Sequence, residues 1–244
     1  MKLYVLPVES ACDAHCSFCI TKFRKVARKQ LLVIEDLREA LEKVAVEKIE
    51  ITGGGEPTLH PQLETIIALC AGKARTQLYT HGAHLRGNVG LLESLCVSRA
   101  HYDDAENERI MGIEYDFNTI IQNGVPLKLS LLLHASGIQT VNEVKKYLQW
   151  AQGKAKEVVI RQLFEHDYQG KLDGEFVSSE KIFRQLNVTH YSLTPQENPV
   201  FTWGNLKVEM EYRSCACEMD NPVLHADGRL YQGWSNFPYD SHGN

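Results

Sequence analysis

The chain has 244 residues, of which 43% are hydrophobic and 23% are charged, and its formal net charge is −5. This composition is typical of a globular protein, and the acidic balance argues against a nucleic-acid partner. No apolar run reaches the roughly 18 residues of a membrane span, and the N-terminal residues predict a strand, not a signal peptide. Seven unevenly spaced cysteines indicate a cytoplasmic metal or redox site instead of a disulfide framework.

Short apolar runs alternate with helical patterns through the first two thirds of the chain. We expect strands at residues 3–8, 48–52, 76–80, 96–100, 126–133 and 157–164. The spacing of apolar residues predicts helices at residues 35–46, 61–71, 90–95, 104–123 and 140–151. Strands and helices in this alternation favour an α/β fold with parallel strands and right-handed crossovers. An open sheet and an incomplete barrel both fit the pattern.

The pattern changes after about residue 167. A loop-like stretch is followed by strand-like runs at residues 188–194, 206–215 and 223–234, and Asp227-Gly228 predicts a hairpin turn in the last of them. We therefore predict a core of residues 1–167 and a small C-terminal α+β cap of residues 168–244 with antiparallel character.

Three cysteines, Cys12, Cys16 and Cys19, follow the first strand with the spacing C-x3-C-x2-C. The carboxyl ends of parallel strands are where ligands bind in α/β proteins. A closed zinc site needs four ligands, and an iron–sulfur cluster is normally held by four thiolates. Three thiolates leave one iron of a [4Fe–4S] cluster open to another ligand. His15 offers a fourth ligand to zinc, but it adjoins Cys16, and neighbouring residues rarely both reach one tetrahedral ion.

A second motif, Gly54-Gly55-Glu56-Pro57, follows the second strand. Glycines let the backbone approach a ligand closely, and the Glu56 carboxylate offers an acceptor to an ammonium group. The alternative is a tight strand-to-helix turn with a helix-capping acid.

The two motifs together resemble the signatures of the radical S-adenosylmethionine (radical SAM) enzymes, and the resemblance covers about residues 3–165. It implies a partial (β/α)6 TIM-like barrel in which Cys12, Cys16 and Cys19 hold a [4Fe–4S] cluster. S-adenosylmethionine (SAM) then chelates the open iron. Its reductive cleavage gives a 5′-deoxyadenosyl radical, which abstracts hydrogen from the substrate.

The resemblance also implies a set of residues that contact SAM: Phe18, Gly54, Gly55, Glu56, Thr80, Ser98, Ser130 and Arg161. Phe18 occupies the position of an aromatic residue near the adenine. His81 follows Thr80 where the family has asparagine, so it is instead a candidate substrate contact. A structural role remains the alternative for each polar residue, and Arg161 in particular could pair with an acid of the protein.

The C-terminal segment resembles a degenerate SPASM or twitch extension, with Cys215 and Cys217 ahead of the predicted hairpin. Two thiols are too few for a four-cysteine auxiliary cluster. The segment either closes the active site without a cluster, or binds a metal with Cys215, Cys217 and a histidine such as His225 or His242, or its thiols act on the substrate or stay inert. Three aromatic residues either stack on a flat substrate or form the core of the cap: Tyr231, Trp234 and Phe237.

The leading interpretation is a radical SAM enzyme, of lyase or oxidoreductase type, that acts on a small organic substrate. A nucleobase-like substrate, as for a queuine lyase, suits the compact chain. A flavodoxin- or ferredoxin-like electron donor could dock on the basic residues at 22–29. The alternatives are a glycyl-radical enzyme activase, a peptide-modifying radical SAM enzyme and a non-catalytic metal or iron–sulfur protein.

Overall fold

The computed structural model describes residues 1–19, 30–163, 173–211 and 221–233. Its central strands are β1 (Lys2–Val5), β4 (Lys48–Ile51), β5 (Arg75–Thr80), β6 (Ser94–Ser98), β7 (Leu127–Leu133), β8 (Glu157–Gln162), β9 (Ser192–Leu193), β10 (Pro199–Trp203), β11 (Leu206–Glu211), β12 (Pro222–Leu224) and β13 (Leu230–Gln232). They form an 11-stranded sheet in the order β13-β12-β1-β4-β5-β6-β7-β8-β11-β10-β9. All neighbours from β12 to β11 are parallel, whereas β13, β10 and β9 pair antiparallel at the edges.

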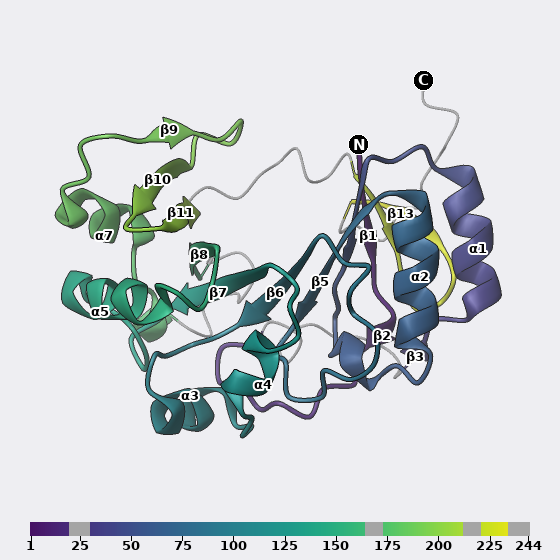
Figure 1. The fold of residues 1–244 in the computed structure, drawn as a ribbon, viewed down its shortest axis with the longest axis horizontal. Helices are drawn as coiled ribbons and strands as arrows, with labels where there is room; N and C mark the ends of the chain where they lie inside the picture. Colours follow the sequence, from purple (N-terminus) through teal and green to yellow (C-terminus); the bar gives the residue numbers. More distant parts are fainter. Residues whose placement is uncertain (20–29, 164–172, 212–220, 234–244) are drawn as a thin grey trace.

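The described helices are α1 (Ile34–Lys43), α2 (Leu63–Lys73), α3 (Asp104–Met111), α4 (Phe117–Ile121), α5 (Val141–Ala151) and α7 (Ser179–Leu186). Short 3-10 turns, η2 (Pro57–Leu59) and η3 (Asp173–Glu175), and a ribbon of β2 (Val8–Glu9) with β3 (Gln30–Leu31) complete the described elements. Figure 1 shows α1 and α2 side by side near one end of the sheet, with α5 and α7 near the other. None of the helices in the described ranges has the length and apolar character that a membrane crossing requires.

The two faces of the sheet differ in chemistry. Alternate strand residues, including Leu3, Ile49 and Leu129, join the apolar faces of the helices in one hydrophobic core. The intervening positions lie on the opposite face and carry many polar or charged side chains: Lys48, Glu50, Tyr79, Lys128, Glu157, Arg161 and Glu211. The second face therefore presents a surface suited to polar ligands.

The predicted α/β fold with six parallel core strands, β1 and β4 to β8, is confirmed, but two helix predictions are wrong. Residues 104–123 form two helices, because Gly112 ends α3 in the left-handed conformation, with φ of 63°. Residues 90–93 form turns instead of the expected helix, and β6 begins at Ser94. That strand therefore starts and ends earlier than the predicted range of 96–100.

Residues of the predicted cap extend the core sheet at both edges. β11 pairs in parallel with β8, and β12 pairs in parallel with β1. The hairpin turn predicted at Asp227-Gly228 is confirmed between β12 and β13, with Gly228 at φ of 81°. Neither α7 nor β10 is predicted from the sequence, although Ser178 accepts a hydrogen bond from the Lys181 N–H as the N-cap of α7. The predicted boundary at residue 167 lies outside the described residues.

Candidate functional site at the carboxyl edge of the sheet

The cysteine loop lies beyond β1 and packs on the C-terminal end of α3. The His15 N–H donates to the Met111 carbonyl over 2.8 Å, and the Cys16 Sγ lies 3.6 Å from the same oxygen. Cys16 and Phe18 pack against a small apolar cluster of Ala100, Ile110 and Met111. The three cysteines of the motif, Cys12, Cys16 and Cys19, are all partly exposed. The cysteine loop is therefore held in a defined position against α3, and its thiols lie near the surface.

Two glycines make room for this loop. The Glu56 N–H donates to the Ala11 carbonyl over 2.8 Å, and a Cβ at Gly55 would lie 2.3 Å from that oxygen. At Gly112 a Cβ would lie 2.8 Å from the His15 Cβ. A Cβ at Gly54, in contrast, would meet only the Glu9 Cγ at 3.5 Å. Gly55 therefore lets the cysteine loop approach the turn after β4, in addition to any ligand that the motif receives.

Glu56 is almost fully buried, at 3% exposure, and its carboxylate is a hydrogen-bonding hub. Oε1 accepts from the Thr58 N–H at 3.0 Å, the Thr58 hydroxyl at 2.6 Å and the Thr80 hydroxyl at 2.5 Å. Oε2 accepts from the His81 N–H at 3.0 Å. The predicted helix-capping alternative is thus realised in η2, where Glu56 is the N-cap. The carboxylate also joins the end of β4 to the end of β5.

Asp13, next to Cys12, contacts two histidines at the end of β5. The His81 Nε2 lies 3.0 Å from one carboxylate oxygen, and the His84 Nε2 contacts the other. Partial burial opposes ionisation of Asp13, but the hydrogen bonds from His84 and His81 lower its pKa below the ordinary value. Neither Asp13 nor His84 is predicted from the sequence. An acid adjoining a metal-binding cysteine, and two histidines three residues apart after a strand, are the signals that could have indicated them.

Of the predicted SAM contacts on the strands, two lie side by side and one is hydrogen-bonded elsewhere in the site. Ser98 and Ser130 are register partners in β6 and β7, and Ser98 is exposed. Thr80, the predicted contact in β5, donates instead to Glu56. Phe18 lies with its ring 4.9 Å from the ring of His134, a fully buried residue just after β7. The loop aromatic is thus placed against the carboxyl end of a sheet strand.

Arg161 in β8 has a protein partner on the polar face. Its Nε donates to Glu211 of β11 over 2.7 Å. Burial alone would lower the pKa of Arg161, but the Glu211 carboxylate outweighs it and raises this pKa above the ordinary value. The structural alternative for Arg161 is therefore realised here, with Glu211 as the acid.

The loop has the donors that an iron–sulfur cluster requires. Partial burial, followed by the charges of Glu56 and Asp13, raises the pKa of the Cys12 thiol to about 11, against a hydrogen bond from Ala14. A bound cation is therefore needed to make Cys12 a thiolate at neutral pH. A single zinc ion would draw its sulfur ligands to about 3.8 Å from one another. Among the described residues, the set of metal-binding side chains within 4.8 Å contains Cys12 but neither Cys16 nor Cys19. A cluster fits better, because each thiolate binds a different iron.

Other predicted features divide between described and undescribed parts of the chain. Cys70 and Cys96 are buried, and burial raises the pKa of their thiols to about 12 and about 11, which keeps them protonated and unreactive at neutral pH. His225 and Tyr231 contact each other, with ring centroids 4.7 Å apart. Several predicted features lie outside the described residues: the basic residues at 22–29, Cys215, Cys217, Trp234, Phe237 and His242.

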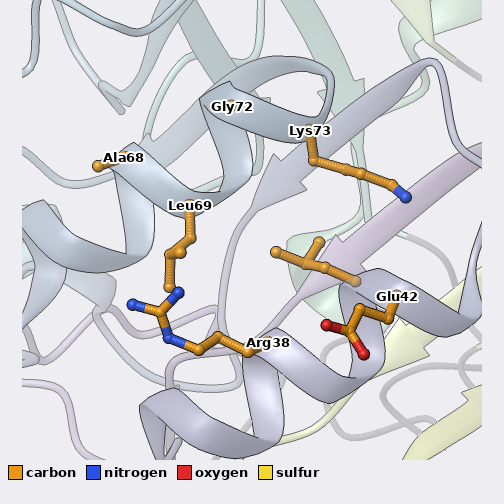
Figure 2. Close-up of a pocket in the computed structure, with 7 residues that line it drawn as sticks. Arg38, Glu42, Ala68, Leu69, Gly72 and Lys73 are labelled. Atoms are coloured by element: carbon orange, nitrogen blue, oxygen red, sulfur yellow. The ribbon is translucent and has the colours of Figure 1, made fainter.

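A hollow of about 400 Å³ lies away from this site, in the outer helical layer. Figure 2 shows Arg38 and Glu42 of α1 facing Leu69 and Lys73 of α2 across it. Neither the cysteines nor the Gly54–Glu56 turn line it, so it does not bear on their chemistry.

Comparison with known proteins gives matches only among solved structures, since neither protein-family models nor curated proteins match the chain. The crystal structure of Streptococcus suis SuiB bound to precursor peptide SuiA matches with a TM-score of 0.73 and 15% identity, covering 100% of this chain and 62% of that one. SuiB bound to S-adenosylmethionine matches at 0.64, with 15% identity and coverage of 94% and 59%. The chain thus spans less than two thirds of SuiB.

A third match is a histidine-tagged form of anSMEcpe with bound AdoMet, that is, S-adenosylmethionine. Its TM-score is 0.55 at 14% identity, and the match covers 95% of this chain and 73% of that one. Sequence identity at this level shows a shared fold and nothing finer. The chain therefore shares its partial-barrel α/β fold with SuiB and anSMEcpe.

Proposed function

We propose that the protein is a radical SAM enzyme that cleaves S-adenosylmethionine reductively and abstracts a hydrogen atom from its substrate. The observation that carries the proposal is the packing of the cysteine loop directly on the glycine–glutamate turn. The Ala11 carbonyl accepts from the Glu56 N–H, and Gly55 leaves the space for this contact. Both motifs thus meet at the carboxyl edge of a sheet whose fold is shared with structures of SuiB and anSMEcpe that contain S-adenosylmethionine.

In this proposal Cys12, Cys16 and Cys19 hold a [4Fe–4S] cluster. When bound, the cluster supplies the electron that cleaves SAM. Glu56 keeps the turn after β4 in place through Thr58, Thr80 and His81, and this turn is the proposed contact of the SAM amino group. Further SAM contacts are proposed for Phe18 of the loop, Gly54 and Gly55 of the turn, Thr80 at the end of β5, and Ser98, Ser130 and Arg161 of the polar face.

The polar face supports a polar substrate. The side chains of Glu50, Lys128 and Arg161 lie on it, and two of them are paired with acids of the sheet. A small polar organic molecule is the leading substrate class that we propose. A peptide substrate is the second candidate, because the match with the highest TM-score named above is SuiB in complex with its precursor peptide SuiA. A flavodoxin- or ferredoxin-like protein is the proposed electron donor.

Cluster binding and SAM binding test this proposal together. We expect the anaerobically reconstituted protein to contain about four iron and four sulfide ions per chain. After reduction it should give the electron paramagnetic resonance signal of a [4Fe–4S]⁺ cluster, and SAM should shift that signal. The matched control is Cys70→Ala, because Cys70 is a buried cysteine of α2 outside the loop. A signal that SAM leaves unchanged would contradict the proposed coordination.

A further inference from the structure

We propose that Cys12, Asp13, His81 and His84 form a binding site for one Zn²⁺ ion in the protein that lacks the cluster. This inference stands apart from the proposed function, but it shares one residue with it. Zinc and the [4Fe–4S] cluster therefore exclude each other at Cys12, and the loop has two alternative metal-bound states.

The donor atoms already lie close together. The Cys12 Sγ, a carboxylate oxygen of Asp13 and a ring nitrogen of His81 all lie within 4.8 Å of one another. The second carboxylate oxygen of Asp13 contacts the His84 Nε2. With zinc bonds of about 2.0–2.3 Å, tetrahedral ligand atoms lie about 3.3–3.8 Å apart. Cys12, Asp13 and His81 need only small movements to close around an ion, whereas His84, which contacts Asp13 but lies outside that set of three, must turn toward it.

The type and charge of the donors favour zinc among common divalent ions. One thiolate, one carboxylate oxygen and two imidazole nitrogens are ligands that zinc accepts, whereas Mg²⁺ and Ca²⁺ prefer oxygen alone. The thiolate of Cys12 and the carboxylate of Asp13 balance both charges of the ion. The two neutral imidazoles of His81 and His84 add no charge, so the occupied site is neutral.

The surroundings hold one ligand firmly and leave the others accessible. His81 is 4% exposed, and its N–H donates to Glu56, which fixes the end of β5. The side chains of Asp13 and His84 are 35% and 37% exposed, so an ion can enter from solvent. The site thus combines one rigid, buried ligand, His81, with two partly exposed ligands, Asp13 and His84, and this combination allows the bound metal to exchange.

The proton on His81 must move when zinc binds. Its Nδ1 accepts from the Ala83 N–H at 3.1 Å, so in the metal-free protein the ring hydrogen is on Nε2 and is donated to Asp13. Coordination through Nε2 transfers the ring hydrogen to Nδ1 and breaks the contact with Ala83. Loss of one such hydrogen bond is small beside the free energy of zinc coordination.

Cobalt titration of the cluster-free full-length chain tests the site, because Co²⁺ replaces zinc and reports its ligands. We expect about one equivalent to bind, with tetrahedral d–d bands and a thiolate-to-cobalt absorption band. Cys12→Ser should remove the thiolate band, and His84→Ala should weaken binding more than about tenfold. His84 is partly exposed, so its replacement should leave the circular dichroism spectrum unchanged. Cys16→Ser and Cys19→Ser should bind cobalt as the wild type does.

A second arm measures competition with the cluster. Wild-type protein preloaded with zinc should incorporate less iron during reconstitution than the zinc-free protein, and the difference should disappear in His84→Ala. Equal cobalt affinity in His84→Ala, or loss of the thiolate band in Cys16→Ser or Cys19→Ser, would overturn the zinc site. Either of these outcomes would contradict the zinc site and leave the proposed [4Fe–4S] cluster unaffected. Failure of the zinc-free protein to assemble a cluster would instead contradict only the proposed function.

Discussion

Glu56 shows how one side chain can hold two segments of the site together, the turn after β4 and the end of β5. Its two carboxylate oxygens accept hydrogen bonds from Thr58, Thr80 and His81. A carboxylate can only accept, and every neighbouring group here is a donor. The surroundings therefore specify this residue type, whatever ligand the adjoining glycines receive.

We predict that Glu56→Gln lowers the free energy of unfolding by about 1–3 kcal/mol. In either orientation the amide NH₂ of glutamine faces an N–H or O–H donor, so at least one buried donor loses its acceptor. Urea denaturation of the metal-free protein measures the change. Glu42→Gln, at an exposed position of α1, is the control and should have little effect. Equal stability of Glu56→Gln and the wild type would show that the hydrogen bonds of the Glu56 carboxylate do not stabilise the fold.

Glu50 on the polar face gives a prediction about pH. Its side chain is 7% exposed, and it lies 3.1 Å from the Lys2 Nζ and 2.7 Å from the Lys48 Nζ. Burial opposes ionisation, but the two lysines lower the pKa of Glu50 below its ordinary value of 4.5. The ionised form is thus favoured by folding, and its contribution is present above about pH 4.5 and lost as the pH falls below it.

We therefore expect Glu50→Gln to destabilise the protein at neutral pH, and the difference from the wild type to shrink as the pH falls below about 4.5. Urea denaturation of both proteins at several pH values gives the comparison. A difference that stays constant down to about pH 3 would contradict the assigned role of Lys2 and Lys48.

Sequence spacing predicted the cysteines and Glu56 because each motif is local. It did not predict the partners of Asp13, which lie 68 and 71 residues away in the chain. Arg161 illustrates the same limit. An arginine on the sheet face is favoured by an acid partner, but only the pairing of β8 with β11 shows that Glu211 provides it.

At the level of elements, the position of the cysteine loop leaves room for a side chain at Gly54 but not at the adjacent Gly55. A Cβ at Gly55 would lie 2.3 Å from the Ala11 carbonyl oxygen, whereas a Cβ at Gly54 would make an ordinary 3.5 Å contact with Glu9. A side chain at Gly55 would force the cysteine loop to move, whereas a side chain at Gly54 would leave the loop in place.

Gly55→Ala should accordingly bind much less iron and sulfide on reconstitution than Gly54→Ala, because the displaced loop no longer brings its thiols together. Iron and sulfide analysis of the two variants, prepared side by side, tests this. Equal iron and sulfide content in the two variants would show that the position of the cysteine loop does not depend on Gly55. Circular dichroism spectra of both variants check that the sheet and helices are retained.

Helix periodicity predicted α1 and α5 well because their apolar faces pack on the sheet core. It failed at residues 104–123, where Ile110, Phe117 and Ile120 keep a helix-like spacing across the break. Only the left-handed backbone at Gly112 ends α3, and the same glycine leaves room for His15 of the cysteine loop. The break therefore makes room for the cysteine loop, and local helix propensity could not indicate this contact.

Across the whole molecule, strands from the C-terminal part of the chain extend the sheet at both edges. Val223 of β12 pairs with Tyr4 of β1, and Glu211 of β11 pairs with Arg161 of β8. The sequence predicted strands in this region but not their partners, because pairing between distant segments depends on the assembled sheet. The continuity of the sheet places the predicted cap residues and the cysteine loop in one structure.

Formation of 5′-deoxyadenosine from SAM tests the central claim most directly. The reconstituted protein, reduced anaerobically with dithionite and supplied with SAM, should release 5′-deoxyadenosine and methionine. Cys12→Ala, Cys16→Ala and Cys19→Ala should each abolish this release, because each removes one of three anchors of the cluster, and Cys70→Ala should retain it. No 5′-deoxyadenosine from the iron-loaded wild type, or undiminished release from any of the three loop variants, would contradict the account.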